Sequence, residues 1–112
     1  MHELSICQSI GTIVGKHAAG REVHVIRLRI GKLRQIVPDT LEYCWSLVSE
    51  DTSLAGSRLE IESIPASIKC LQCERTQTLA EANFICAACG GAQVEIVSGD
   101  EFLITSLEIA EA

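Results

Sequence analysis

Four cysteines between positions 70 and 89 are the residues best suited to chemistry in this sequence. They form two Cys-x-x-Cys pairs, Cys70/Cys73 and Cys86/Cys89, with twelve residues between the pairs. Two residues between ligands let a tight turn present both sulfurs on one side, so two such turns can supply four thiolates to one tetrahedral ion. Zinc suits this donor set. Because four protein sulfurs leave no position open for water, we predict a structural zinc site.

Two other interpretations of the quartet remain open. The pairs can be two local disulfides, or one of them can be a redox-active dithiol. Disulfides are typical of secreted chains, and nothing in this sequence marks it as secreted. A redox Cys-x-x-Cys opens a helix within a βαβ pattern, which neither pair does here. The metal site is therefore favoured.

The composition indicates a folded chain and argues against several classes of protein. Of 112 residues, 47% are hydrophobic, which favours a packed core over disorder. The net charge of −6 opposes binding to nucleic-acid phosphates. No apolar run reaches the roughly 18 residues of a membrane span, and the start has no basic and apolar signal, so we expect a cytoplasmic protein. No catalytic arrangement stands out, so we do not expect an enzyme.

Hydrophobic periodicity predicts two helices. The first covers residues 3–19 and ends at Gly20, a residue that commonly terminates helices. The second begins at Pro38, which is tolerated in a first turn, and ends within 49–52. Its buried stripe is predicted to contain Leu41, Cys44, Trp45 and Val48.

Alternating apolar and polar residues predict three strands, over 21–30, 58–64 and 101–109. In the last strand we expect Leu103, Leu107 and Ile109 to share one face. The cysteines lie between the second and third strands. The predicted fold class is therefore α+β: a small sheet flanked by two helices, with an inserted zinc-ribbon-like module that contains the four cysteines. We expect one domain to comprise residues 1–65 and 98–112, and the zinc domain to comprise residues 66–97.

The first residues, Met1-His2-Glu3, offer a second kind of metal chemistry. A residue as large as His2 disfavours removal of Met1 and leaves a free amine. That amine, the deprotonated His2 amide nitrogen and the His2 imidazole Nδ1 form adjacent chelate rings and can lie in one plane. Planar nitrogen donors select Ni²⁺ or Cu²⁺ over Zn²⁺.

Met1-His2-Glu3-Leu4-Ser5 together with the spacing of the cysteine quartet resembles the HypA family of nickel metallochaperones. Residues 27–33 and 99–109 support the resemblance, which covers nearly the whole chain. The resemblance implies nickel binding by Met1, His2 and Glu3, in the domain formed by residues 1–65 and 98–112. It implies zinc binding by Cys70, Cys73, Cys86 and Cys89.

The resemblance also implies a function and partners. Such a protein delivers Ni(II) during [NiFe]-hydrogenase maturation, in concert with a HypB-type GTPase, to the hydrogenase large subunit. Some relatives also serve urease. The chain is expected to be a monomer or a homodimer, with no nucleic acid or membrane among its partners.

The fourth nickel donor stays open. It can be Glu3, a solvent molecule or a group from a partner, and the plane can instead contain the amine and both amides. The remaining candidates, His17, His24, Cys7 and Cys44, are better explained as structural residues than as ligands. The alternative functions are an acidic zinc-ribbon interaction module without nickel and a thiol redox protein.

Overall fold

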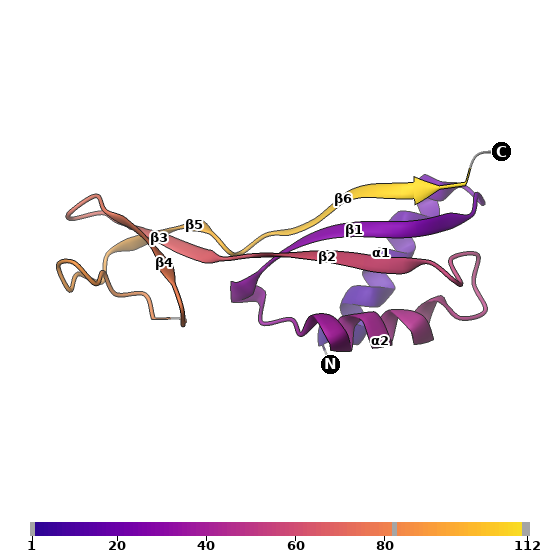
Figure 1. Ribbon diagram of the computed structural model, residues 1–112, viewed down its shortest axis with the longest axis horizontal. Coiled ribbons are helices and arrows are strands. Elements are labelled where there is room, and N and C mark those ends of the chain that lie inside the picture. The colour runs from indigo at the N-terminus through magenta and orange to yellow at the C-terminus, as the bar shows by residue number, and fades with distance from the viewer. Residues whose placement is uncertain (1, 82, 111–112) are drawn as a thin grey trace. The chain divides into compact units, whose positions relative to one another are not determined.

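The computed structural model describes residues 2–81 and 83–110, without the side chain of His2. These residues form two helices, one 3₁₀ turn and six strands, which confirms the predicted α+β class. In chain order they are α1 (His2–Ala18), β1 (Val23–Gly31), η1 (Lys32–Arg34), α2 (Pro38–Ser49), β2 (Arg58–Ile64), β3 (Ala66–Cys70), β4 (Thr76–Leu79), β5 (Val94–Ser98) and β6 (Phe102–Ile109). The strands make two sheets, in the orders β2-β1-β6 and β4-β3-β5 (Figure 1).

The chain divides into two compact units. The first unit contains residues 36–62 and the described parts of 1–28 and 103–112, and the second contains 29–35 and 63–102. Within the first unit, α1 crosses behind the strands and α2 lies below them in Figure 1. Among the described helices, none has both the length and the hydrophobicity needed to span a membrane.

The core of the first unit is formed where α1 and α2 pack against β1. The side chains that are most completely buried there are Cys7, Ile10, Val14, Ile26, Leu28, Leu41 and Trp45. The Trp45 indole donates a hydrogen bond to the Ser57 hydroxyl at 3.1 Å, so the one polar atom of this ring is satisfied. Because α1 ends in two residues of positive φ, Ala19 and Gly20, the chain turns sharply into β1, as the sequence predicts.

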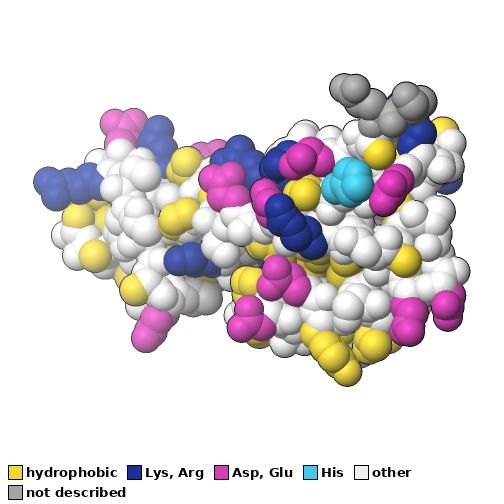
Figure 2. Space-filling view, turned by 45° about the vertical axis from the view of Figure 1, so that its right-hand side comes forward, with side chains coloured by type: hydrophobic (Ala, Val, Ile, Leu, Met, Phe, Trp, Pro, Cys, Tyr) yellow, Lys and Arg dark blue, Asp and Glu magenta, His cyan; other side chains and the backbone are white. Residues whose placement is uncertain are grey.

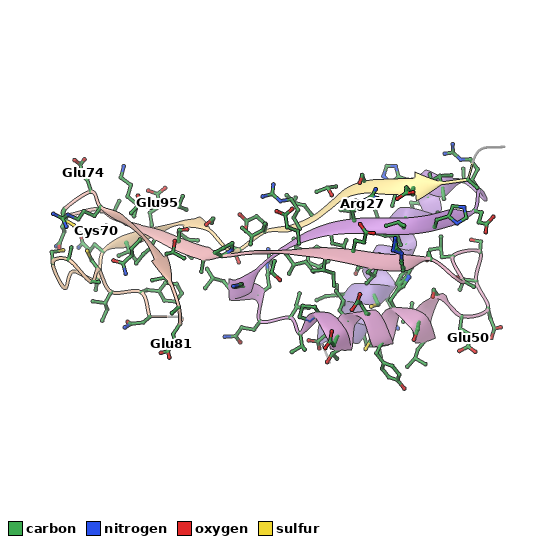
Figure 3. The ribbon with its side chains drawn as sticks, in the orientation of Figure 1. Arg27, Glu50, Cys70, Glu74, Glu81 and Glu95 are labelled. Atoms are coloured by element: carbon green, nitrogen blue, oxygen red, sulfur yellow. The ribbon has the colours of Figure 1, made fainter. Side chains whose placement is uncertain are left out.

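The face of the sheet opposite Ile26 and Leu28 is polar. Arg27 lies between those two residues in β1 and therefore points to the other side. Its guanidinium donates to Glu60 of β2 at 3.1 Å and also pairs with Glu108 of β6. One arginine thus bridges the two outer strands, at the position labelled in Figure 3.

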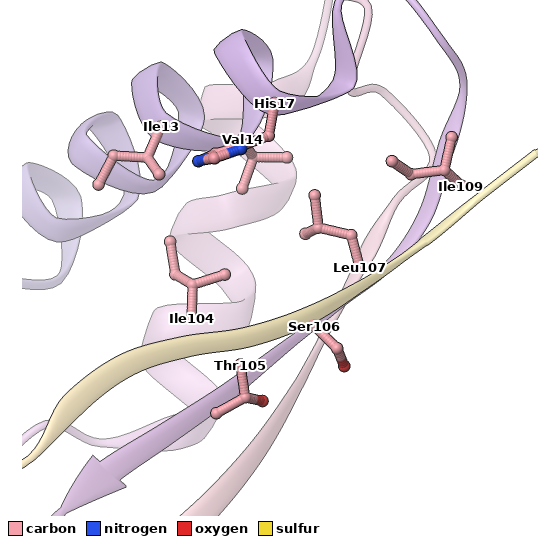
Figure 4. A pocket seen from close by; sticks show the side chains of 8 residues that line it. All are labelled: Ile13, Val14, His17, Ile104, Thr105, Ser106, Leu107 and Ile109. Carbon is pink, nitrogen blue, oxygen red and sulfur yellow. The ribbon is translucent and has the colours of Figure 1, made fainter.

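The prediction that Leu103 shares one face of β6 with Leu107 and Ile109 is wrong. Leu103 is 49% exposed, and Ile104 takes its place beside the other two. Thr105 and Ser106 both point away from α1 in Figure 4, so the alternation of the strand is broken there. The break shifts the apolar face by one residue, which a strict period of two cannot anticipate.

Three backbone segments of the second unit are in direct contact. The Gly31 amide donates to the Glu101 carbonyl, and the Leu33 amide donates to the Gly99 carbonyl, both at 2.8 Å. A Cβ atom on Gly31 would overlap the Gly99 carbonyl. Gly99 has a φ of +104° and packs on the backbone of Ala66. Both glycines are therefore required by close approach.

We expect Gly31→Ala to destabilise the chain by on the order of 3 kcal/mol, because backbone atoms of Gly99 cannot move aside as a side chain can. Gly15→Ala is the matched control, since no atom lies within 4 Å of its Cβ position. Alanine also favours the helix by about 1 kcal/mol there. Thermal unfolding followed by circular dichroism should show a lower midpoint for Gly31→Ala only. Equal midpoints for the two variants would contradict the packing argument.

Cys7 is a core residue whose thiol is held neutral. Its side chain is fully buried, and its sulfur donates to the Leu41 carbonyl at 3.4 Å. Burial, with smaller contributions from the negative charges of Cys44 and Glu3, raises the pKa of Cys7 to about 11. Since an unfolded thiol titrates at about 8.5, this group favours the folded chain below that pH. The contribution is lost as the pH rises toward 11.

The free energy of unfolding should therefore fall by on the order of 2–3 kcal/mol between pH 8 and pH 11 because of this one group. Urea unfolding followed by Trp45 fluorescence measures the slope. The same series on Cys7→Ala isolates the contribution, because that variant cannot ionise at this position. Identical slopes in the two proteins would show that the Cys7 thiol is not shielded in the folded chain.

Candidate metal centre

The first cysteine pair sits where β3 ends in a turn. Cys70 is the last residue of β3 (labelled in Figure 3), and residues 71–73 form the turn. The Cys70 amide donates to the Arg75 carbonyl at 2.8 Å, and the Glu74 amide donates to the Cys70 carbonyl at 2.9 Å. Glu74 adopts a φ of +62°, which lets the chain reverse into β4. The Cys73 amide donates to the Cys70 sulfur at 3.5 Å, so the turn itself holds both sulfurs on one side.

The second pair is held by a similar turn over residues 87–89. The Cys86 amide donates to the Gly91 carbonyl at 2.9 Å, and the Gly90 amide donates to the Cys86 carbonyl at 2.8 Å. Gly90 has a φ of +72°, a conformation that glycine adopts without steric cost. Gln77 of β4 ties this turn to the sheet, because its side-chain oxygen accepts the Ala87 amide at 2.9 Å.

The structure brings all four predicted cysteines together. The sulfurs of Cys70 and Cys89 lie 3.6 Å apart, as do those of Cys73 and Cys86, and all four sulfurs lie within 4.8 Å of one another. All four thiols are free, and 3.6 Å is far from the bonded distance of about 2.05 Å in a disulfide. A tetrahedron with zinc–sulfur bonds of about 2.3 Å has sulfurs about 3.8 Å apart. The donor set therefore fits a tetrahedral ion.

Backbone amides stabilise the thiolate form at one cysteine of each turn. The amides of Cys73 and Gln72 lower the pKa of Cys70 to about 6, and the amide of Cys89 lowers the pKa of Cys86. At Cys89 the Gly91 amide acts in the same direction, but the neighbouring sulfurs of Cys70 and Cys86 outweigh it. They raise the pKa of Cys89 to about 12. Four thiolates this close repel one another, so a cation is needed for all four to be ionised together.

Of the predicted nickel ligands, Met1 and the side chain of His2 lie outside the described residues. Glu3 lies in the first turn of α1, and its Oε2 accepts the Val37 amide at 3.4 Å. Hydrogen bonds from its own amide and from Val37 lower the pKa of Glu3, so the carboxylate is ionised at neutral pH. The contact places the start of α1 beside the start of α2.

Among the described residues, the four cysteines are the one group of three or more metal-ligating side chains close enough to share an ion. His17 and His24 are both exposed and belong to no such group. His17 lies at a groove of about 410 Å³ between α1 and β6 instead of in the core (Figure 4). Cys44 is half-buried on α2.

Two glutamines support the cysteine turns, and neither is predicted from the sequence. Gln77 holds the second turn, as described above, and Gln72 packs over Gly91, where a Cβ atom would meet its side-chain oxygen. Glutamine has no spacing rule that marks it as a support for a metal turn. The pairing of Gln77 with Ile68 across the sheet is what puts it in reach.

The geometry defines a class: a small α+β protein with a closed, four-sulfur metal centre in one compact unit and an acidic side chain at the start of a helix in the other. The family described as "Hydrogenase/urease nickel incorporation, metallochaperone, hypA" matches residues 1–109. The chain belongs to this family.

Relatives agree with that assignment, and a solved structure has a similar fold. The chain is 41% identical to the hydrogenase maturation factor HypA of Nostoc sp., over 99% of this chain and 97% of the relative. It is 40% identical to HypA of Geotalea uraniireducens, over 97% and 99% of the two chains. The solution structure of the Ni metallochaperone HypA from Helicobacter pylori has a similar fold. Its TM-score is 0.67 at 19% identity, with 96% of each chain covered.

Proposed function

We propose that this protein is a nickel metallochaperone that binds Ni(II) at its amino terminus and delivers it during [NiFe]-hydrogenase maturation. The observation that carries the proposal is the family match over residues 1–109, which includes the Met1-His2-Glu3 start. Carriers of this kind move an ion and transform no substrate, so the protein is proposed not to be an enzyme. Its place of action is proposed to be the cytoplasm.

The proposed nickel donors are the Met1 amine, the His2 amide nitrogen and the His2 imidazole, with Glu3 beside them. The position of His2 as the first residue of α1 supports this chemistry. The first amides of a helix have no intrahelical acceptor, so the His2 amide can lose its proton to nickel without breaking a helical hydrogen bond. The positive end of the helix dipole disfavours a bound cation, and the ionised Glu3 offsets that effect. Because these two electrostatic effects oppose each other, the nickel ion is bound weakly enough to be released to a partner.

The zinc ion is proposed to be structural and to be bound by Cys70, Cys73, Cys86 and Cys89. We assign it to a domain of residues 66–97, and nickel to a domain of residues 1–65 and 98–112. The compact unit that contains the cysteines also includes residues 29–35. Because the four sulfurs occupy all four corners of the tetrahedron, this ion has no position for the cargo.

The proposed partners are a HypB-type GTPase and the hydrogenase large subunit. The net charge of −6 argues against nucleic acid. The chain is proposed to act as a monomer or a homodimer.

Metal analysis of the purified chain with its own first residue tests the proposal. We expect one zinc and one nickel per chain after dialysis against both ions, and transfer of the nickel to metal-free large subunit. Zinc without nickel uptake would instead support a zinc-ribbon interaction module. A metal-free chain with reversible disulfides would support a thiol redox protein. Either result would contradict the proposed function.

A further inference from the structure

The outer face of α2 carries two large apolar side chains that the fold does not use. Tyr43 is 65% exposed and Leu47 is 51% exposed, although Leu41, Trp45 and Ser49 on the other side of the helix are buried. Residues four apart lie next to each other on a helix, so Tyr43 and Leu47 form one continuous apolar surface. Val37, just before the helix, is 54% exposed. Tyrosine is one of the residues most enriched at the centres of protein interfaces.

Three carboxylates surround this apolar pair. Asp39 precedes the pair in the first turn of α2, Glu42 is next to Tyr43 in the chain, and Glu50 directly follows the end of the helix, whereas α2 contains no lysine or arginine. Within the described part of the chain, none of the three takes part in an ion pair. In Figure 2, hydrophobic side chains project at the lower edge, over α2, with acidic side chains on either side. Glu50 is labelled in Figure 3.

On the sheet of the same unit, in contrast, carboxylates are paired with an arginine. There Glu60 and Glu108 are both neutralised by Arg27. The charges of α2 are therefore not compensated by the chain itself, and they favour a cationic partner. They also disfavour a second copy of the same face and any nucleic acid, because like charges would meet.

We propose that this surface of α2, formed by Asp39, Glu42, Tyr43, Leu47 and Glu50, docks a segment of a partner protein in which an apolar side chain is flanked by lysine or arginine. The Val37 amide donates to the Glu3 carboxylate, so the surface begins beside Glu3, one of the predicted nickel ligands. The twelve residues of α2 span about 18 Å, so the surface extends about that far from the contact with Glu3. A partner docked there is placed to exchange nickel with the amino terminus. That role rests on the proposed function, whereas the docking itself does not.

Binding of two purified probes tests the proposal: the HypB-type GTPase and the hydrogenase large subunit of the same organism. Isothermal titration with the zinc-loaded chain compares the original protein with Tyr43→Ala/Leu47→Ala and with Glu42→Lys/Glu50→Lys. We expect each double variant to bind at least one probe about tenfold more weakly or worse. Added salt should weaken binding of the original chain more than binding of the lysine variant.

Leu103→Ala and Glu81→Lys are matched controls, because both side chains are exposed and lie outside α2. They should change the affinity by less than about twofold. The α2 variants should keep the zinc content, the nickel content and the helical circular dichroism of the original chain. If the original chain does not bind nickel, the proposed function is refuted, but the result on docking is unaffected.

The docking proposal is overturned if both probes bind the α2 variants as tightly as the original chain, or if neither probe binds the original chain. It is also overturned if sedimentation shows that the α2 variants change the oligomeric state, since the face would then join copies of this chain.

Discussion

A chain with one extra residue before Met1 should lose its nickel affinity by about a hundredfold or more. The added residue converts the Met1 amine into an amide and displaces the first donor of the proposed chelate. Loss of a group that only supports a ligand already lowers metal affinity by about 10–100-fold, so loss of a direct donor should cost at least as much. Competition with a chromogenic nickel chelator measures the effect, and acetylation of the amine should reproduce it.

Zinc content is the internal control for this experiment. The cysteine centre lies in a different compact unit, so one zinc per chain should remain after extension or acetylation. His2→Gln should give the same nickel loss, and a glutamine keeps a large second residue that disfavours removal of Met1. Nickel affinity that survives all three changes would place the cargo elsewhere in the chain.

Cys70→Ala should remove zinc and unfold the second unit while the first unit stays folded. Apparent binding free energies of structural zinc are about 10–16 kcal/mol, and this energy is folding energy where the site does not exist in the unfolded chain. The second unit has a small core, with Ile64, Ala66 and Ile68 among its buried residues beyond two of the cysteines. Without the ion, this core is too small to order the two cysteine turns.

Zinc analysis and hydrogen exchange check this result. The amides of Cys86 and Gly90, which are hydrogen-bonded in the second turn, should lose protection. Trp45 fluorescence and the helical circular dichroism should change little, because both come from the first unit. Cys44→Ala is the matched control, since this cysteine lies outside the four-sulfur group and its loss should leave zinc in place. A zinc-free Cys70→Ala chain with a protected second turn would contradict a structural role for the ion.

Local patterns predicted the elements that local forces determine. The Pro38 start of α2 and the bounds of β2, Arg58–Ile64, follow from capping and alternation within each segment. The meeting of the four cysteines follows from their spacing, because each pair needs only its own turn. These features depend on few long-range contacts.

Features that depend on long-range contacts could not be predicted from the sequence. Ile104 replaces Leu103 on the face of β6 that turns toward α1, because the alternation of the strand is broken at Thr105 and Ser106. The requirement for glycine at position 31 arises from a segment that lies far away in sequence, around Gly99.

X-ray absorption at the nickel and zinc edges of one doubly loaded sample tests the central claim most directly. We expect four sulfurs around zinc at about 2.3 Å. We expect a planar, nitrogen-rich nickel environment without sulfur. An octahedral, all-oxygen nickel environment, or sulfur bound to nickel, would contradict it.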